Sequence, residues 1–410
     1  MTLTAFQKQS ADLARGCAVA LAVSLPFSTA LDNVLLGLVL LCWLAGGNHR
    51  AYWERLRHHP VAWTVAGFIA LLALGLTYGE RAPGDGMHYF GKYADLLFAV
   101  VFLSLFHDAE WRRRALLAFA GSLVLLLALS YSIRFGVIPP NHWIAGTPAN
   151  PVVFKQWITH GILMAFGAYL FTLFGLQASQ PGRRAVWYGL ALLALGNVLF
   201  MIQGRTGYVV LALLALYLGY VWRGLAGLAI AALCTSAVIA IAFILPGALH
   251  DRTELAVREF QQTQPGVATQ TSVGRRIEFY RNSLAIIRDH PLLGVGTGGF
   301  PYAYEKQVAG TAMAPTRNPH NEYLHLTLQL GIVGLMALFV LFWVPWQTAP
   351  RLPTWHEQHL ARGLVLTIAA GCLFNSLLID HAERLLFAWG LGVLFAGLQS
   401  PSTPLPSDRT

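Results

Sequence analysis

Long apolar stretches, separated by short polar connections, dominate the sequence. A helix needs roughly 20 mainly apolar residues to cross the hydrocarbon core of a bilayer, and about twelve stretches approach this length. The predicted spans are 14–30, 32–47, 61–78, 93–106, 115–133, 152–176, 185–202, 207–222, 225–246, 321–344, 359–379 and 385–399. This pattern predicts an all-α, polytopic membrane protein with about twelve transmembrane helices.

One long polar segment interrupts the apolar pattern and divides the chain. The predicted parts are nine transmembrane helices in 1–246, a long outer loop in 247–320, three transmembrane helices in 321–400 and a polar tail in 401–410. Within the loop, apolar residues at helical spacing predict about two helices, with a break at Gln264–Gly266. Ser272 suits the start of the second helix, and Pro291 follows its end.

Composition supports this interpretation and excludes other classes. Hydrophobic residues make up 56% of the chain and charged residues 11%, as expected for a protein surrounded by lipid. The net charge of +9 does not indicate a nucleic-acid partner, because no basic run is longer than Arg112–Arg114 and no nucleic-acid-binding signature is present. The four cysteines lie in apolar stretches without CxxC spacing, which favours packing roles over a disulfide or zinc site.

Basic residues fall on alternate connections and therefore predict the topology. Cytoplasmic loops of membrane proteins carry an excess of Lys and Arg. The cations on one side are Lys8, Arg50, Arg55, Arg57, Arg112, Arg113, Arg114, Arg183, Arg184, Arg223 and Arg351. We expect this side to be the cytoplasm, with both termini there and the long loop on the opposite face.

A few cations lie on the outer side, against this bias. Arg205 occupies a tight outer turn, and Lys155 lies at an outer helix end. Two interpretations remain open for each: extension toward lipid headgroups, or binding of an anionic substrate such as a lipid phosphate or diphosphate. Together, the outer cations favour the anionic substrate.

The second helix predicted in the outer loop adds more arginines, and a histidine follows the loop. Arg275, Arg276, Arg281 and Arg288 each suit a solvated surface, but as a set they favour an anion site. In NPHNEYLHL, His320 and Asn321 precede a predicted span, and Asn321 suits its N-cap. A neutral histidine beside arginines can accept a proton from a hydroxyl group while the arginines hold a departing phosphate.

Asp380 occupies the last outer turn, and its partner is open between two equal interpretations. Its carboxylate can fix His320 or Arg276, or it can pair with Arg384 four residues later. No DxD or similar acidic pair lies beside the candidate residues, so we predict no metal and no cofactor.

A glycine-rich motif, GVGTGGF, also lies in the loop. Gly294, Gly296 and Gly299 satisfy the dinucleotide pattern G-x-G-x-x-G. However, the motif follows a predicted helix and no βαβ unit surrounds it. We interpret it as a turn that lets the backbone approach a neighbouring element or a ligand.

The order of four motifs resembles the O-antigen ligase family of Gram-negative inner membranes, whose superfamily includes polysaccharide polymerases and protein O-oligosaccharyltransferases. These motifs are QGRTGY, SVGRRIEFY, HPLLGVGTGGF and NPHNEYLHLTLQLGIVG, all in the second half of the chain. The resemblance implies a glycosyltransferase that moves a glycan from undecaprenyl diphosphate to lipid A core at the periplasmic face. It also implies functional arginines at Arg205 and Arg276, an essential histidine at His320 and an acidic position at Asp380.

The chemistry of the residues agrees with this implication. Arg205 and Arg276 would neutralise the diphosphate as it leaves, and His320 would take the acceptor proton, with inversion at the anomeric carbon. Further predicted substrate-binding residues are Arg275, Asn321, Asp380 and Lys155. Alternatives remain open: a polymerase that extends the lipid-linked glycan, a protein O-oligosaccharyltransferase, for which a larger outer domain is expected, and a transporter, for which repeats and midplane charges are expected.

Overall fold

The computed structural model describes residues 3–139, 144, 146–244, 248–262 and 271–398. Within these ranges every regular element is a helix, and Thr147 and Asn150 form one isolated bridge. The all-α class predicted from the sequence is therefore confirmed. The predicted tail 401–410 and the predicted break at Gln264–Gly266 lie outside the described residues.

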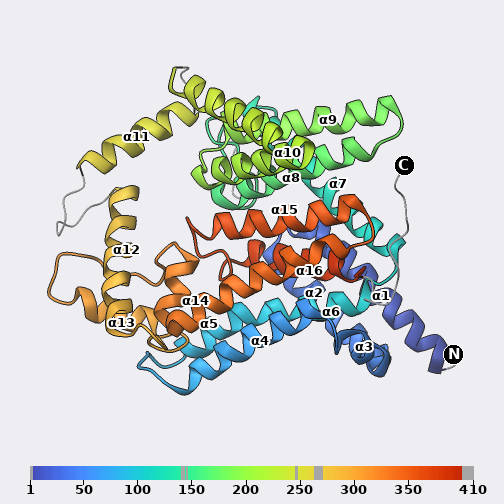
Figure 1. Cartoon of the computed structure of the whole chain (residues 1–410), viewed down its shortest axis with the longest axis horizontal. Coiled ribbons are helices and arrows are strands. Elements are labelled where there is room, and N and C mark those ends of the chain that lie inside the picture. Colours follow the sequence, from blue (N-terminus) through green and yellow to red (C-terminus); the bar gives the residue numbers. More distant parts are fainter. Residues whose placement is uncertain (1–2, 140–143, 145, 245–247, 263–270, 399–410) are drawn as a thin grey trace.

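Most of the helices pack into one bundle (Figure 1). They are α1 (Leu3–Ser24), α2 (Thr29–Ala45), α4 (Pro60–Leu74), α6 (Phe98–Leu105), α7 (Ala109–Arg134), α8 (Trp157–Gln177), α9 (Pro181–Gly196), α10 (Arg205–Ile244), α14 (Glu322–Thr348), α15 (Trp355–Gly371) and α16 (His381–Phe395). The remaining elements are α3 (His49–Leu56), η1 (Gly75–Thr77), α5 (Asp85–Ala94), η2 (Asp95–Leu97), η3 (Asn197–Met201), α11 (Ala248–Gln262), α12 (Ser272–Asp289), α13 (Phe300–Val308) and η4 (Ala349–Arg351).

The two ends of the bundle differ. Figure 1 shows α12 and α13 at one end, called here the site end, and α3 at the other, called the α3 end. The beginning of α1 lies at the α3 end, because Gln7 packs against Gly47. The end of α16 lies there too, because the carbonyl oxygen of Phe395 is 3.1 Å from Nε2 of His59. Both ends of the described chain therefore lie on the same side of the bundle.

Several helices are suited to cross a membrane. Among the described residues, six are long and apolar enough: Pro60–Thr77, Ala109–Arg134, Trp157–Gln177, Pro181–Met201, Arg205–Ile241 and Glu322–Arg351. A seventh is added if α2 and α3, bent by 106°, count as one span. The chain is thus a polytopic membrane protein, whereas the count of about twelve crossings stays a prediction.

α10 consists of two helices that pack against each other. Its backbone leaves the helical region at Arg223 and at Gly224, where φ is 56°. A Cβ atom on Gly219 would lie 2.6 Å from the Cβ of Ala231, although twelve residues of continuous helix span about 18 Å. The chain therefore reverses at Gly224, in agreement with the separate spans predicted at 207–222 and 225–246.

α14 also reverses, at Gly331, where φ is 63°. The ring centroids of Tyr323 and Phe339 are 5.7 Å apart, although sixteen residues of straight helix span about 24 Å. The expectation of one continuous helix over 321–344 is therefore corrected. The sequence did not reveal the reversal because the residues on both sides of Gly331 are apolar.

The glycine-rich turn packs on the first half of α14 and on the end of α4. The backbone amides of Val295 and Gly296 donate to the carbonyl oxygens of Leu328 and Gln329 at 2.9 and 2.8 Å. Gly296 has a φ of 87°, and a Cβ atom there would lie 2.3 Å from the carbonyl oxygen of Tyr78. The interpretation of GVGTGGF as a turn of close backbone approach is confirmed.

Replacing Gly331 by Ala is expected to destabilise the protein strongly. The backbone of Gly331, with φ 63° and ψ −156°, costs a residue with a Cβ about 1–3 kcal/mol, and this Cβ would also lie 2.2 Å from the backbone of Leu292. Gly136→Ala is the matched control, since its φ is 73° but its Cβ would meet no atom within 4 Å. Thermal unfolding of the purified variants should show a larger fall in Tm for Gly331→Ala; equal falls would contradict the tight contact at the reversal.

Candidate functional site

His320 lies in the turn before α14 and is half-buried. Its φ of 54° is the only positive value at a non-glycine residue in the described part of the chain. Such a conformation persists when surrounding contacts fix it. Here the amide of His320 donates to Oδ1 of Asn318 at 2.8 Å, and Oη of Tyr280 lies 3.2 Å from the His320 carbonyl oxygen.

A chain of two hydrogen bonds orients the imidazole ring. Nδ1 of His320 is 2.9 Å from Oδ1 of Asn375, and Nδ2 of Asn375 donates to Oδ2 of Asp380 at 2.6 Å. Because Nδ2 of Asn375 faces the carboxylate of Asp380, Oδ1 of Asn375 faces the imidazole of His320. This carbonyl oxygen can only accept a hydrogen bond. Nδ1 must therefore carry the proton, and Nε2 keeps its lone pair.

These contacts decide between the two interpretations of Asp380. The carboxylate is linked to His320 by hydrogen bonds through Asn375. Arg384 does not serve as its ion-pair partner, because the guanidinium donates to Oδ2 of Asp95 at 2.6 and 3.1 Å. The expected direct contact of Asp380 is thus replaced by a bridge through an amide that the sequence analysis did not consider.

The surroundings of His320 and Asp380 determine the protonation states of both groups. Burial lowers the pKa of His320; the hydrogen bond to Asn375 raises it, and the charges of Arg276 and Arg275 lower it further. The imidazole is therefore neutral at neutral pH, as a proton acceptor must be. Burial and the nearby carboxylate of Glu383 raise the pKa of Asp380 to about 7, so this group changes charge close to neutral pH.

α12 presents one of its two adjacent arginines to this histidine. The ring of Phe279, one turn beyond Arg276, stacks on the imidazole with a centroid distance of 6.0 Å. Arg276 is half-buried, whereas Arg275 is exposed, and Arg276 has the larger effect on the pKa of His320. In the described residues neither guanidinium has an acidic partner. The helix phase thus favours Arg276 as the arginine facing the site.

Arg205 begins α10 at the site end. A Cβ atom on Gly207 would lie 3.0 Å from the backbone of Gly161, so the first turns of α10 and α8 are in close contact. Ile162 in turn approaches Gly371, the last residue of α15. The loop that carries Asn375 and Asp380 starts there, so α10 begins on the same side of the bundle as the histidine.

Two further predicted residues have partners within the protein. Oδ1 of Asn321 accepts from the amide of Leu324 at 3.0 Å, which confirms its expected role as the N-cap of α14. Lys155 donates to Oγ1 of Thr29 at 2.7 Å, and burial lowers its pKa. Both side chains thus have structural contacts, and their roles in substrate binding stay predictions.

The sequence analysis missed Asn375. The predicted span 359–379 placed this residue inside a membrane helix, whereas α15 ends at Gly371 and Asn375 lies in the following loop. Only 6% of the residue is exposed. The available signal was an Asn-Ser pair at the end of an apolar run, five residues before an acid.

A second polar network lies behind the site and is fully buried. Oη of Tyr93 donates to Oε1 of Glu322 at 2.5 Å and lies 3.1 Å from Nδ1 of His325. Nε2 of His325 is 3.2 Å from Nε2 of Gln329, whose Oε1 accepts from the amide of Gly298 at 2.6 Å. His325 therefore has a structural role apart from His320. Across the described residues, no group of three or more His, Cys, Asp or Glu side chains is placed to hold a metal ion.

Comparison with known proteins agrees with the motifs. Residues 189–339 match a family model described as O-antigen ligase, and this region contains Arg205, Arg275, Arg276 and His320 but neither Asn375 nor Asp380. The chain is also 34% identical over 79 residues to an uncharacterized protein of Haemophilus influenzae. That similarity covers 18% of this chain and 20% of the relative, so it spans only about a fifth of the relative's length. The comparison thus supports the resemblance to the O-antigen ligase family over residues 189–339.

Proposed function

We propose that this protein is an O-antigen ligase, which transfers a glycan from undecaprenyl diphosphate to a sugar hydroxyl of lipid A core. The observation that carries the proposal is the pair of hydrogen bonds that joins His320 to Asp380 through Asn375, from which we infer that Nε2 of His320 keeps its lone pair. The charge of Arg276 acts on this base and lowers its pKa. The family match over 189–339 supports the assignment.

The proposed topology has twelve crossings in the bacterial inner membrane, with both termini cytoplasmic and the site end periplasmic. Outside the six candidate spans, α1, α2, α15 and α16 have 22, 17, 17 and 15 residues, close to or above the lower limit of about 17 for a crossing. A further crossing is proposed for α6 together with the preceding α5 and η2, residues 85–105. α10 supplies two crossings because it reverses at Gly224. Arginines gathered at the α3 end support a cytoplasmic location for that end.

In this proposal the arginines act on the donor. The bond between the anomeric carbon and the diphosphate oxygen breaks, and its electron pair leaves on the diphosphate. Arg205 and Arg276 neutralise the charge that develops there, and their fixed guanidinium groups need no reorganisation. This role requires no metal ion, so the reaction is proposed to be metal-independent.

His320 acts on the acceptor. Nε2 takes the proton of a sugar hydroxyl of lipid A core as its oxygen bonds to the anomeric carbon. Attack from the face opposite the diphosphate inverts that carbon. The imidazolium that forms is stabilised through Asn375 by Asp380, since a positive charge on His320 favours the ionised carboxylate.

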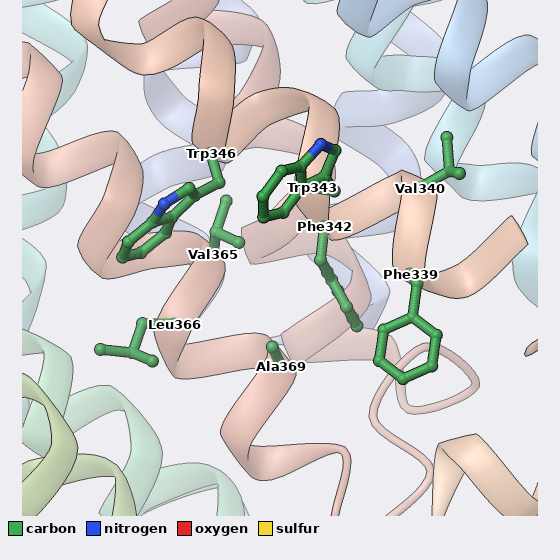
Figure 2. Close-up of a pocket in the computed structure, with 8 residues that line it drawn as sticks. All are labelled: Phe339, Val340, Phe342, Trp343, Trp346, Val365, Leu366 and Ala369. Atoms are coloured by element: carbon green, nitrogen blue, oxygen red, sulfur yellow. The ribbon is translucent and has the colours of Figure 1, made fainter. Parts of the chain in front are cut away.

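An apolar groove beside the site suits the polyprenyl chain of the donor. Figure 2 shows its lining residues, which project from the second half of α14 and from α15; they are Phe339, Val340, Phe342, Trp343, Trp346, Val365, Leu366 and Ala369. The groove has a volume of about 440 Å³. Tyr323, three residues from His320, packs on Phe339 and Phe342 and donates to the carbonyl oxygen of Ala369. The groove thus begins one helical turn from the proposed base.

Reconstitution tests the function directly. The purified protein, in vesicles with undecaprenyl diphosphate-linked glycan and lipid A core, is expected to transfer the glycan to lipid A core, and EDTA should not reduce the rate. The product is identified by mass spectrometry.

Other outcomes of this experiment contradict parts of the proposal. Longer lipid-linked glycans would make the protein a polymerase, and movement of the lipid without a covalent product would make it a transporter. Loss of transfer in EDTA with rescue by magnesium would refute metal independence.

The two adjacent arginines of α12 should differ in their effect on catalysis. Arg276→Ala is expected to lower kcat/KM by about 10²–10³-fold, because it removes a donor that acts on the leaving group. Arg275→Ala removes the same charge from an exposed position and should cost less than about tenfold. Steady-state transfer rates of the two variants decide the point; equal losses would mean that helix phase does not select Arg276.

Asn375 should control both the rate and its pH dependence. Transfer needs neutral His320, so the rate rises as pH rises through the His320 pKa. Because the bond to Asn375 raises that pKa, Asn375→Ala should move this rise to lower pH while reducing the maximal rate by about 10²-fold.

Ser376→Ala is the matched control for Asn375→Ala. Ser376 is buried beside Asn375, and its Oγ has no hydrogen-bond partner in the described residues. The control should keep the parent profile. An unchanged profile in Asn375→Ala would mean that Asn375 does not position the base.

A further inference from the structure

A basic cavity of about 580 Å³ lies at the α3 end, opposite the proposed active site. Its cationic and titratable lining comes from α3, α7, η4 and the connections between helices: Arg55, His58, His59, His107, Arg112 and Arg351. Glu54 is the acidic residue among the described lining residues. Three guanidinium groups and one carboxylate therefore face the same space.

Two acidic side chains at or near the cavity form ion pairs with arginines. Glu54 pairs with Arg57 at 2.7 Å, and Glu357 pairs with Arg112 at 2.9 Å. Arg55 donates instead to the neutral ring nitrogen Nδ1 of His107 at 3.1 Å. Its positive charge is therefore held in place by a contact that does not neutralise it.

Surrounding tryptophans place the cavity at the level of lipid headgroups. Trp53 on α3 and Trp63 on α4 are 56% and 54% exposed, and their rings meet edge to face at 6.3 Å. Tryptophans exposed in this way are typical of the membrane–water interface. α3 itself bends away from α2 by 106°, as expected for a short helix that lies along that interface.

We propose that this cavity binds the headgroup of an anionic phospholipid, with Arg55 and Arg351 holding the phosphates. The positive-inside rule accounts for arginines at this end of the bundle, but not for their gathering around one cavity between helices. Basic pockets between membrane helices suit doubly charged headgroups, so the ligand is the two-phosphate lipid cardiolipin. The site is separate from the proposed function and does not depend on it.

Native mass spectrometry of the full-length protein in detergent tests the site. Cardiolipin should bind more tightly than phosphatidylcholine, and the double variant Arg55→Ala/Arg351→Ala should weaken cardiolipin binding by roughly tenfold or more. The single variant Arg55→Gln, which keeps most of the side-chain volume, should weaken it to a smaller extent.

Arg184→Ala/Arg223→Ala is the matched control, because it removes the same charge at the α3 end from residues that do not line the cavity. This variant should bind cardiolipin as the parent does. If both double variants weakened cardiolipin binding equally, the weakening would be explained by net charge alone, and the proposal would be wrong. Displacement of cardiolipin by millimolar inorganic phosphate, or equal binding of phosphatidylcholine, would also overturn it.

Discussion

The hydrogen bond between His320 and Asn375 is the interaction on which the proposed chemistry depends. A histidine serves as a base only when one ring nitrogen keeps its lone pair while the other holds the ring in place. Asp380 fixes the amide of Asn375, the amide fixes the tautomer of His320, and Nε2 is left to meet a hydroxyl group. Burial keeps this base neutral, and the adjacent arginines of α12 add positive charge where an anionic leaving group would lie.

This geometry depends in turn on buried Glu322. A carboxylate without exposure is costly unless donors surround it, and here Tyr93 and the amide of Leu378 supply them. The amide of Glu322 also donates to the carbonyl oxygen of Cys372 at 2.9 Å. Glu322 thus helps to join two segments far apart in sequence, the turn at His320 and the loop of Asn375. The same network reaches the glycine-rich turn through His325 and Gln329.

The sequence predicted much of the bundle because apolar stretches bounded by charges determine where helices lie. It separated the halves of α10 because Arg223 and Gly224 interrupt an apolar pattern. It missed the reversal at Gly331, where the residues on both sides are equally apolar. The sequence analysis missed Asn375 for a related reason. The apolar pattern extended the predicted span to residue 379, past the end of α15 at Gly371.

The sequence also did not distinguish Arg276 from Arg275 as the arginine that faces the site, for a different reason. Adjacent residues on a helix point in directions about 100° apart, and the sequence alone does not show which direction meets His320. The stacking of Phe279 on the imidazole supplies that reference. Residues whose role depends on a long-range contact were therefore harder to predict than those at helix ends, such as the N-cap Asn321.

The tautomer of His320 is the most direct measure of the central claim. ¹⁵N chemical shifts of histidine-labelled protein near pH 7, with the His320 signals assigned by their loss in His320→Gln, report which ring nitrogen is protonated. We predict a protonated Nδ1 and an unprotonated Nε2. A proton on Nε2 would contradict the role of Asn375 and the assignment of Nε2 as the base.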